Sequence, residues 1–205
     1  MYAFPSWSLG TREKLKALMM NIKSYLITDP AFYGNTPDTL KSSLTTVFSK
    51  HIPDFAVFRD KQTHSYDELA QTFIGECRTY CITKVLLHGD YRRASSLKAD
   101  GVHLTSTQCD AILEAKALGL YVIISTHTPL EALKAQELGA DAITYSPIFT
   151  SPNKGEPKGL EDLKEIVAKI RVPIFALGGI VTQEHIKAVS TTGAYGFASI
   201  RYFIP

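Results

Sequence analysis

Ser125-Thr126-His127 is the segment of this chain whose residue types are best suited to proton transfer. It directly follows the apolar run Tyr121–Ile124, so its polar side chains stand at the end of a predicted strand. A histidine placed there can titrate near neutral pH and act as a general acid and base. The other interpretation is a capping or packing role, because Thr128-Pro129 is typical of a helix start. The residues alone leave both roles of His127 open. Ser125 and Thr126 are predicted to contact the substrate or its phosphate.

The glycine pair Gly178-Gly179 predicts a binding site for a phosphate. It ends a short apolar run, and a helical segment is predicted from Thr182. Free backbone amides close to a helix N-terminus favour an anion. One helix later a second strand-like segment ends at Ser199 and Ile200, which we place in the same predicted site. A tight turn without a ligand is the alternative.

Three basic side chains could hold a second anionic group. Arg59 and Lys61 alternate at the end of a predicted strand, so both can face the same side. Such a pair suits a phosphate, a diphosphate or a carboxylate, although a solvated strand end would look the same. Lys154 lies in a loop with proline and glycine that resembles a mobile lid. A lid lysine that closes on an anion and an ordinary surface lysine both fit this position.

Two histidines, His88 and His103, also end predicted strands. Each could contact a ligand, and His103 could equally be a hydrogen-bonded core residue. Acidic side chains form no evident cluster, whereas Mg²⁺ needs hard oxygen ligands, normally carboxylates. Asp29 and Asp90 are the nearest candidates. We therefore predict no metal site and no cofactor.

These residues are positioned by an alternation of short apolar runs and helical patterns. The predicted strands are Lys23–Thr28, Phe55–Arg59, Thr83–His88, Gly101–Leu104, Tyr121–Ser125, Ala142–Ser146, Pro173–Ala176 and Gly196–Ser199. The predicted helices are Pro37–Lys50, Ser65–Tyr80, Arg92–Lys98, Ser106–Leu118, Pro129–Leu138, Leu160–Lys169 and Thr182–Thr191. Eight such repeats favour a single (β/α)₈ TIM barrel of the α/β class over an open doubly wound sheet. In a barrel the strand ends meet at one mouth, which would bring the candidate residues together.

Composition narrows the function classes. The chain has 205 residues, 45% of them hydrophobic, and a net charge of +2. This balance gives no electrostatic reason to expect nucleic acid or anionic membrane as a partner. Residues 1–10 lack the pattern of a signal peptide, and three cysteines without paired spacing fit a reducing cytoplasm, where we expect the protein. We predict an N-terminal extension over residues 1–19 and a barrel domain over residues 20–205; a homodimer is compatible with the sequence.

Six ordered motifs resemble one known superfamily. They are Tyr25-Leu-Ile-Thr-Asp29, Phe58-Arg-Asp-Lys61, Ala99-Asp-Gly-Val-His-Leu104, Ile124-Ser-Thr-His127, Ser146-Pro-Ile-Phe-Thr-Ser-Pro-Asn-Lys154 and Pro173-Ile-Phe-Ala-Leu-Gly-Gly-Ile180. With these motifs the chain resembles the thiamine phosphate synthases and TenI-type thiazole tautomerases. The resemblance implies a (β/α)₈ barrel that binds thiazole phosphate or thiamine phosphate, with the phosphate at Gly178 and Gly179.

The two branches of this superfamily do different chemistry. The synthase joins a hydroxymethylpyrimidine diphosphate to a thiazole phosphate carboxylate with Mg²⁺, whereas the tautomerase only moves a proton on the thiazole. Where the resemblance implies metal-binding carboxylates, this chain has Gly89 and Gln108. We therefore expect a metal-independent tautomerase with His127 as general acid and base and Lys154 closing the site. A Mg²⁺-dependent synthase, which Asp29 or Asp90 would have to serve, is the first alternative, and a non-catalytic binder of these phosphates is the second.

Overall fold

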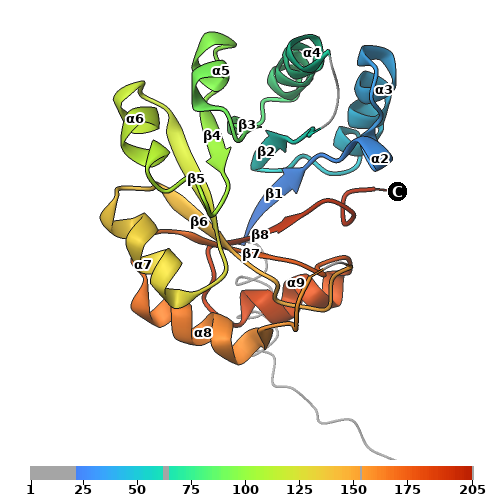
Figure 1. Ribbon diagram of the computed structural model, residues 1–205. Coiled ribbons are helices and arrows are strands. Elements are labelled where there is room, and N and C mark those ends of the chain that lie inside the picture. The colour runs from blue at the N-terminus through green and yellow to red at the C-terminus, as the bar shows by residue number, and fades with distance from the viewer. Residues whose placement is uncertain (1–21, 62–64, 153, 205) are drawn as a thin grey trace, which may run out of the picture.

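The computed structural model describes residues 22–61, 65–152 and 154–204, and these form one closed barrel of parallel strands (Figure 1). The strands pair in chain order, and β8 closes on β1. They are β1 (Lys23–Ile27), β2 (Phe55–Phe58), β3 (Lys84–His88), β4 (Gly101–Leu104), β5 (Tyr121–Thr126), β6 (Ala142–Tyr145), β7 (Ile174–Leu177) and β8 (Gly196–Ser199). The helices are α2 (Pro30–Tyr33), α3 (Pro37–Phe48), α4 (Tyr66–Thr79), α5 (Tyr91–Ser96), α6 (Ala111–Ala117), α7 (Pro129–Glu137), α8 (Gly159–Lys169) and α9 (Gln183–Ser190).

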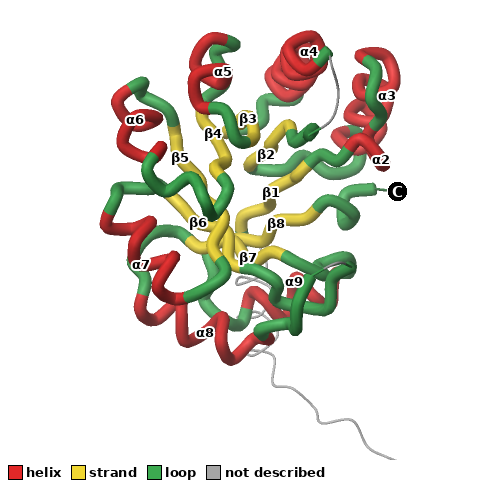
Figure 2. Tube along the Cα trace, viewed as in Figure 1, coloured by secondary structure: helices red, strands yellow, loops and turns green. Residues whose placement is uncertain are grey.

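Helices surround the ring of strands, as Figure 2 shows in red around yellow. The predicted (β/α)₈ barrel is confirmed, and each predicted strand is present within two residues of its expected ends. The predicted extension over residues 1–19 lies outside the described residues. Within the described ranges, no helix is long and apolar enough to cross a membrane.

Local sequence signals set several helix starts. Thr36, Thr128 and Thr182 are N-caps of α3, α7 and α9, and each hydroxyl accepts a hydrogen bond from a backbone amide of the first turn. Proline follows two of these threonines at the first helical position, where its missing amide costs nothing. These caps fix the turn that joins each strand end to the next helix, and therefore the mouth of the barrel.

Two elements differ from the sequence prediction. Helix α2 was not predicted; Asp29 caps it by accepting a hydrogen bond from the amide of Ala31 at 3.1 Å. Helix α6 was predicted from Ser106 but begins at Ala111. The reason is a turn over residues 105–110, in which the side chain of Gln108 accepts a hydrogen bond from the amide of Thr105 at 2.9 Å.

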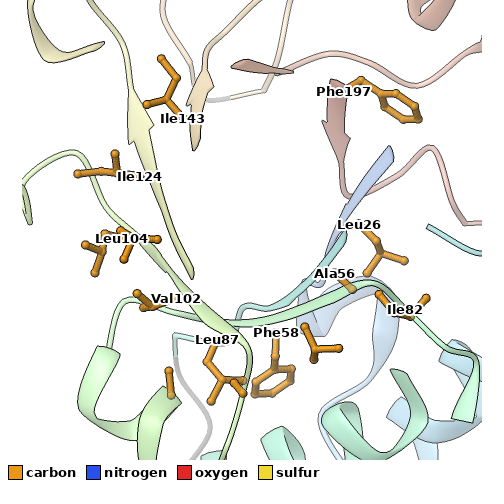
Figure 3. Close-up of a cluster of buried hydrophobic side chains, with 14 of the residues drawn as sticks. Leu26, Ala56, Phe58, Ile82, Leu87, Val102, Leu104, Ile124, Ile143 and Phe197 are labelled. Carbon is orange, nitrogen blue, oxygen red and sulfur yellow. The ribbon is translucent and has the colours of Figure 1, made fainter. Parts of the chain in front are cut away.

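The hydrophobic core has two layers because side chains alternate across each strand. The outer layer lies between strands and helices, and ten of its side chains are labelled around the barrel in Figure 3. The inner layer fills the barrel with Tyr25, Ile27, Phe55, Val57, Leu86, Ile123, Ala142, Phe175 and Ala198. This packing fills the barrel interior, so a ligand can bind only beyond the packed layer, at the ends of the strands.

Candidate active site

A cavity of about 610 Å³ lies at the carboxyl ends of the strands. Predicted site residues that line it are Arg59, Lys61, His88, His103, Ser125, His127, Lys154, Gly178, Gly179, Ser199 and Ile200. Sequence positions from residue 59 to residue 200 therefore meet at one mouth, as the strand-end rule of β/α barrels requires.

Thr126 is the predicted site residue that the structure places elsewhere. Neighbouring residues of a strand face opposite sides, so Ser125 faces the cavity and Thr126 faces away. The Thr126 hydroxyl is buried and donates a hydrogen bond to the carbonyl of Thr144 at 2.9 Å. Its side chain supports the β5–β6 pair and does not line the cavity.

His127 stands at the end of β5 with its backbone and its ring both held. Its amide donates to the carboxylate of Glu131 at 2.6 Å, and Nδ1 lies 3.2 Å from both the carbonyl oxygen and the hydroxyl of Ser146. A carbonyl oxygen can only accept, so that contact favours a proton on Nδ1 and leaves a lone pair on Nε2. Helix capping falls to Thr128 instead. His127 can therefore take up a proton from a ligand.

The Gly178-Gly179 turn combines positive φ angles with close packing. The φ angles are +99° and +70°, and a Cβ on Gly179 would stand 2.6 Å from the carbonyl oxygen of Thr150. Among the described residues, neither glycine amide donates a hydrogen bond to another protein group. The turn also lies just ahead of α9, so free amides and a helix N-terminus coincide there.

Ser199 lines the cavity at the end of β8. Its hydroxyl donates to the carbonyl of Ile180 at 2.7 Å and accepts from the amide of Tyr202 at 3.1 Å. The side chain thus ties the turn after β7 to the turn after β8. The carbonyl of Ile200 accepts a hydrogen bond from the Tyr33 hydroxyl at 2.9 Å.

The loop that carries Lys154 is fixed at both ends. The amides of Ile148 and Phe149 donate to Leu177 and Gly178, each at 3.0 Å. At the other end, the amide of Lys158 donates to the carbonyl of Pro147 at 2.9 Å. Lys154 itself is exposed and lines the cavity from this loop.

Arg59 makes an ion pair that the sequence analysis did not predict. Its Nη1 lies 2.9 Å from the carboxylate of Asp29, and each side chain keeps about a quarter of its surface exposed. The pair joins the ends of β1 and β2 and holds the guanidinium at the rim of the cavity. Lys61 is exposed beside it. The cavity lining at this rim therefore contains Arg59, Lys61 and the carboxylate of Asp29, which leaves positive charge for a ligand.

His88 and His103 are neutral in the folded protein. Burial lowers the pKa of His88 to about 4, with Arg59 and Lys61 adding repulsion. Burial likewise lowers the pKa of His103 to about 3, helped by the nearby His88 and Arg59. Both rings can therefore donate or accept a hydrogen bond without carrying charge at neutral pH.

This burial predicts a stability that falls in mild acid. In the unfolded chain both histidines titrate near pH 6.5, so the unfolded state binds more protons below that pH. The contribution of these two histidines to the free energy of unfolding should be complete above pH 6.5. It should decrease as the pH falls from about 6.5 toward about 4. Urea denaturation at a series of pH values measures this slope. A His88→Gln variant should show a smaller slope, and an unchanged slope would contradict the prediction.

The positions at which the resemblance implies magnesium ligands do not fit a magnesium ion. Gln108 Nε2 donates to the carbonyl of Gly89 at 2.7 Å, so these two positions bond to each other. The carboxylate of Asp90 accepts the amide of Arg93 as the N-cap of α5. No group of three or more histidine, cysteine or acidic residues in the described ranges could hold a metal ion.

Comparison with known proteins identifies the family. The family model for thiamine monophosphate synthase, TMP-TENI, matches residues 24–203. The thiamine-phosphate synthase of Clostridium novyi is 31% identical over 192 residues, which are 88% of this chain and 90% of that protein. The thiamine-phosphate synthase of Syntrophomonas wolfei is 34% identical over 69% of this chain and 70% of its own.

A solved structure agrees with these sequence matches. The thiamine phosphate pyrophosphorylase from Pyrococcus furiosus has a TM-score of 0.75 and 26% identity, covering 89% of this chain and 87% of its own. The N-acetylmannosamine-6-phosphate 2-epimerase from Clostridium perfringens, at 12% identity and a TM-score of 0.68, shares the fold alone. The chain therefore belongs to the thiamine monophosphate synthase (TMP-TENI) family of thiamine biosynthesis enzymes.

Proposed function

We propose that this enzyme is a metal-independent thiazole phosphate tautomerase in which His127 moves the proton. The observation that carries the proposal is the placement of His127, whose Nδ1 faces the Ser146 carbonyl while the ring lines the same cavity as the Gly178-Gly179 turn. Positions 89 and 108 support it, because Gly89 and Gln108 carry no carboxylate that could bind Mg²⁺. The Gln108 side chain is instead hydrogen-bonded to the carbonyl of Gly89.

The phosphate would bind at the glycine turn. The amides of Gly178 and Gly179 and the N-terminus of α9 present partial positive charge to it. At the opposite rim Arg59 and Lys61 would hold the thiazole carboxylate. This arrangement fixes both ends of the substrate and leaves its ring between them.

The chemical step then needs one proton carrier. The lone pair on Nε2 of His127 takes a proton from the non-aromatic thiazole ring. The resulting imidazolium returns the proton to the exocyclic carbon that was doubly bonded to the ring. The double bond thereby shifts into the ring, which makes the thiazole aromatic and regenerates the neutral histidine. Lys154 would close over the anionic substrate and reduce the exposure of the site to water.

A thiamine-phosphate synthase is the second candidate, and the names of the relatives favour it. Arg59, Lys61 and Lys154 are also the cations that a diphosphate would need. The synthase would require a metal site built from groups other than those at positions 89 and 108.

Two assays separate these candidates. Purified enzyme is given the non-aromatic thiazole phosphate carboxylate without metal, and aromatic product is followed by its absorbance. In parallel it is given a pyrimidine diphosphate and thiazole phosphate, with Mg²⁺ or with EDTA. Turnover only in the first assay supports the tautomerase. Mg²⁺-dependent thiamine phosphate in the second establishes the synthase, and no turnover in either overturns the proposal.

Asp90 offers a sharper test of the metal question. If its carboxylate is only an N-cap, Asp90→Asn should leave activity unchanged, because asparagine caps helices equally well. Asp90→Ala should lower the free energy of unfolding by about 1 kcal/mol in urea denaturation. A large loss of Mg²⁺-dependent activity in Asp90→Asn would instead show that the carboxylate binds metal.

A further inference from the structure

Two buried side chains and one half-buried side chain form a hydrogen-bonded chain that leads up to the cavity. The Tyr25 hydroxyl on β1 lies 2.8 Å from His103 Nδ1 on β4, and His103 Nε2 lies 3.0 Å from the Ser125 hydroxyl on β5. Tyr25 is fully buried and His103 is 3% exposed, while Ser125 lines the cavity. The hydrogen-bonded chain therefore connects the closed interior of the barrel with the cavity.

The direction of this chain follows from counting protons. If Tyr25 donates to Nδ1, then Nε2 carries the ring proton and donates to Ser125, and every buried donor has a partner. In the opposite direction Nδ1 would donate to Tyr25, and the phenol proton would have no acceptor among the described residues. An unpaired buried donor costs about 1–3 kcal/mol. The first direction is therefore preferred.

The last proton in the chain belongs to Ser125. Thr144 is the residue beside it in the register of β5 and β6, and the Thr144 hydroxyl is buried without a hydrogen-bond partner in the described ranges. Since Thr144 accepts nothing and Nε2 already donates, the Ser125 proton is directed to the cavity.

We propose that Tyr25 is a positioning residue that holds His103 as the Nε2–H tautomer and so keeps the Ser125 hydroxyl as a donor toward the ligand. The ligand atom next to Ser125 must then be an acceptor, either an anionic or carbonyl oxygen or an unprotonated ring nitrogen. The arrangement differs from a nucleophile activated by a base, because Nε2 has no lone pair to offer Ser125. Only the identity of the ligand rests on the proposed function.

The tautomer of His103 can be measured directly. In long-range ¹H–¹⁵N spectra of the ¹⁵N-labelled wild-type protein at neutral pH, we expect a protonated Nε2 and an unprotonated Nδ1. A proton on Nδ1, or on both nitrogens, would overturn the proposal. This measurement needs no variant and no ligand.

Tyr25→Phe tests the cause. Without the phenol, Nδ1 lacks a partner in either tautomer, so both should be populated. The matched control is Tyr202→Phe, whose hydroxyl binds Gln183 outside the barrel interior and which should leave His103 unchanged. An unchanged tautomer in Tyr25→Phe, or the same change in the control, would contradict the role of Tyr25.

Binding of the thiazole phosphate carboxylate, followed by calorimetry, tests the consequence. Ser125→Ala should weaken it about tenfold, the effect of one hydrogen bond to a charged group. Tyr25→Phe should weaken it about twofold or more, because Ser125 then donates part of the time to His103. This loss should vanish in the Ser125→Ala background, and a loss that persists would overturn the coupling. If the wild type does not bind this compound, the proposed function fails, whereas the tautomer still decides the role of Tyr25.

Discussion

His127→Gln is expected to lower the kcat of thiazole phosphate tautomerisation by about 10²–10⁴-fold, the usual contribution of general acid–base catalysis. Glutamine can retain a hydrogen bond to Ser146 but cannot take up a proton at neutral pH. Because His127 is separate from the Gly178-Gly179 turn, the affinity for substrate should change little. Steady-state kinetics combined with calorimetric binding distinguish the two effects.

His51→Gln is the matched control for this variant. His51 is exposed and contacts the ring of Tyr202 rather than the cavity, so its replacement should leave kcat unchanged. Comparable activity in His127→Gln and wild type would remove His127 from the mechanism. A loss confined to KM would assign it to substrate binding instead.

Gly179→Ala is expected to lower the free energy of unfolding by about 3 kcal/mol or more. The positive φ alone costs an alanine about 1–2 kcal/mol, and its Cβ would meet the carbonyl of Thr150 at 2.6 Å. The collision would force the loop after β6 away from the turn and displace the free amides. Affinity for inorganic phosphate or thiazole phosphate should therefore fall more than tenfold, roughly the effect of one lost charge-assisted hydrogen bond.

Gly119→Ala separates strain from collision. Gly119 has a φ of +76°, but a Cβ there would have no neighbour within 4 Å. Its replacement should cost only about 1–2 kcal/mol in urea denaturation and leave phosphate affinity unchanged. Equal losses of stability in the two variants would show that contact with the loop after β6 does not constrain Gly179.

The fold and the mouth of the barrel could be predicted because they depend on local patterns. Eight short apolar runs alternate with helical segments, and polar residues follow the runs. Because strand ends meet at one face of a barrel, Arg59, His103 and His127 are predicted to lie close together even when no contact between them is known. The same pattern also shows, from side-chain alternation, that Ser125 and Thr126 cannot both face a ligand.

Other features depend on partners distant in sequence, which no local pattern reveals. Asp29 and Arg59 are 30 residues apart, and Tyr25 and His103 are 78 residues apart. Their pairing needs both the barrel register and the side-chain directions. The late start of α6 has in part a similar cause, because Gln108 bonds to Gly89, 19 residues away, as well as to the nearby Thr105. Propensity alone favoured a longer helix there.

The pinned ends of the loop that carries Lys154 limit how far its ammonium group can travel. Hydrogen bonds at Ile148, Phe149 and Lys158 tie both ends of the loop to the barrel. A tethered cation of this kind is present near the glycine turn at a high effective concentration that does not depend on the surrounding solution. The closure proposed for Lys154 would then cost little chain entropy, since the loop ends are already fixed. Lengthening this loop would lower the effective concentration of the Lys154 ammonium group near the glycine turn, although the residue would still be present.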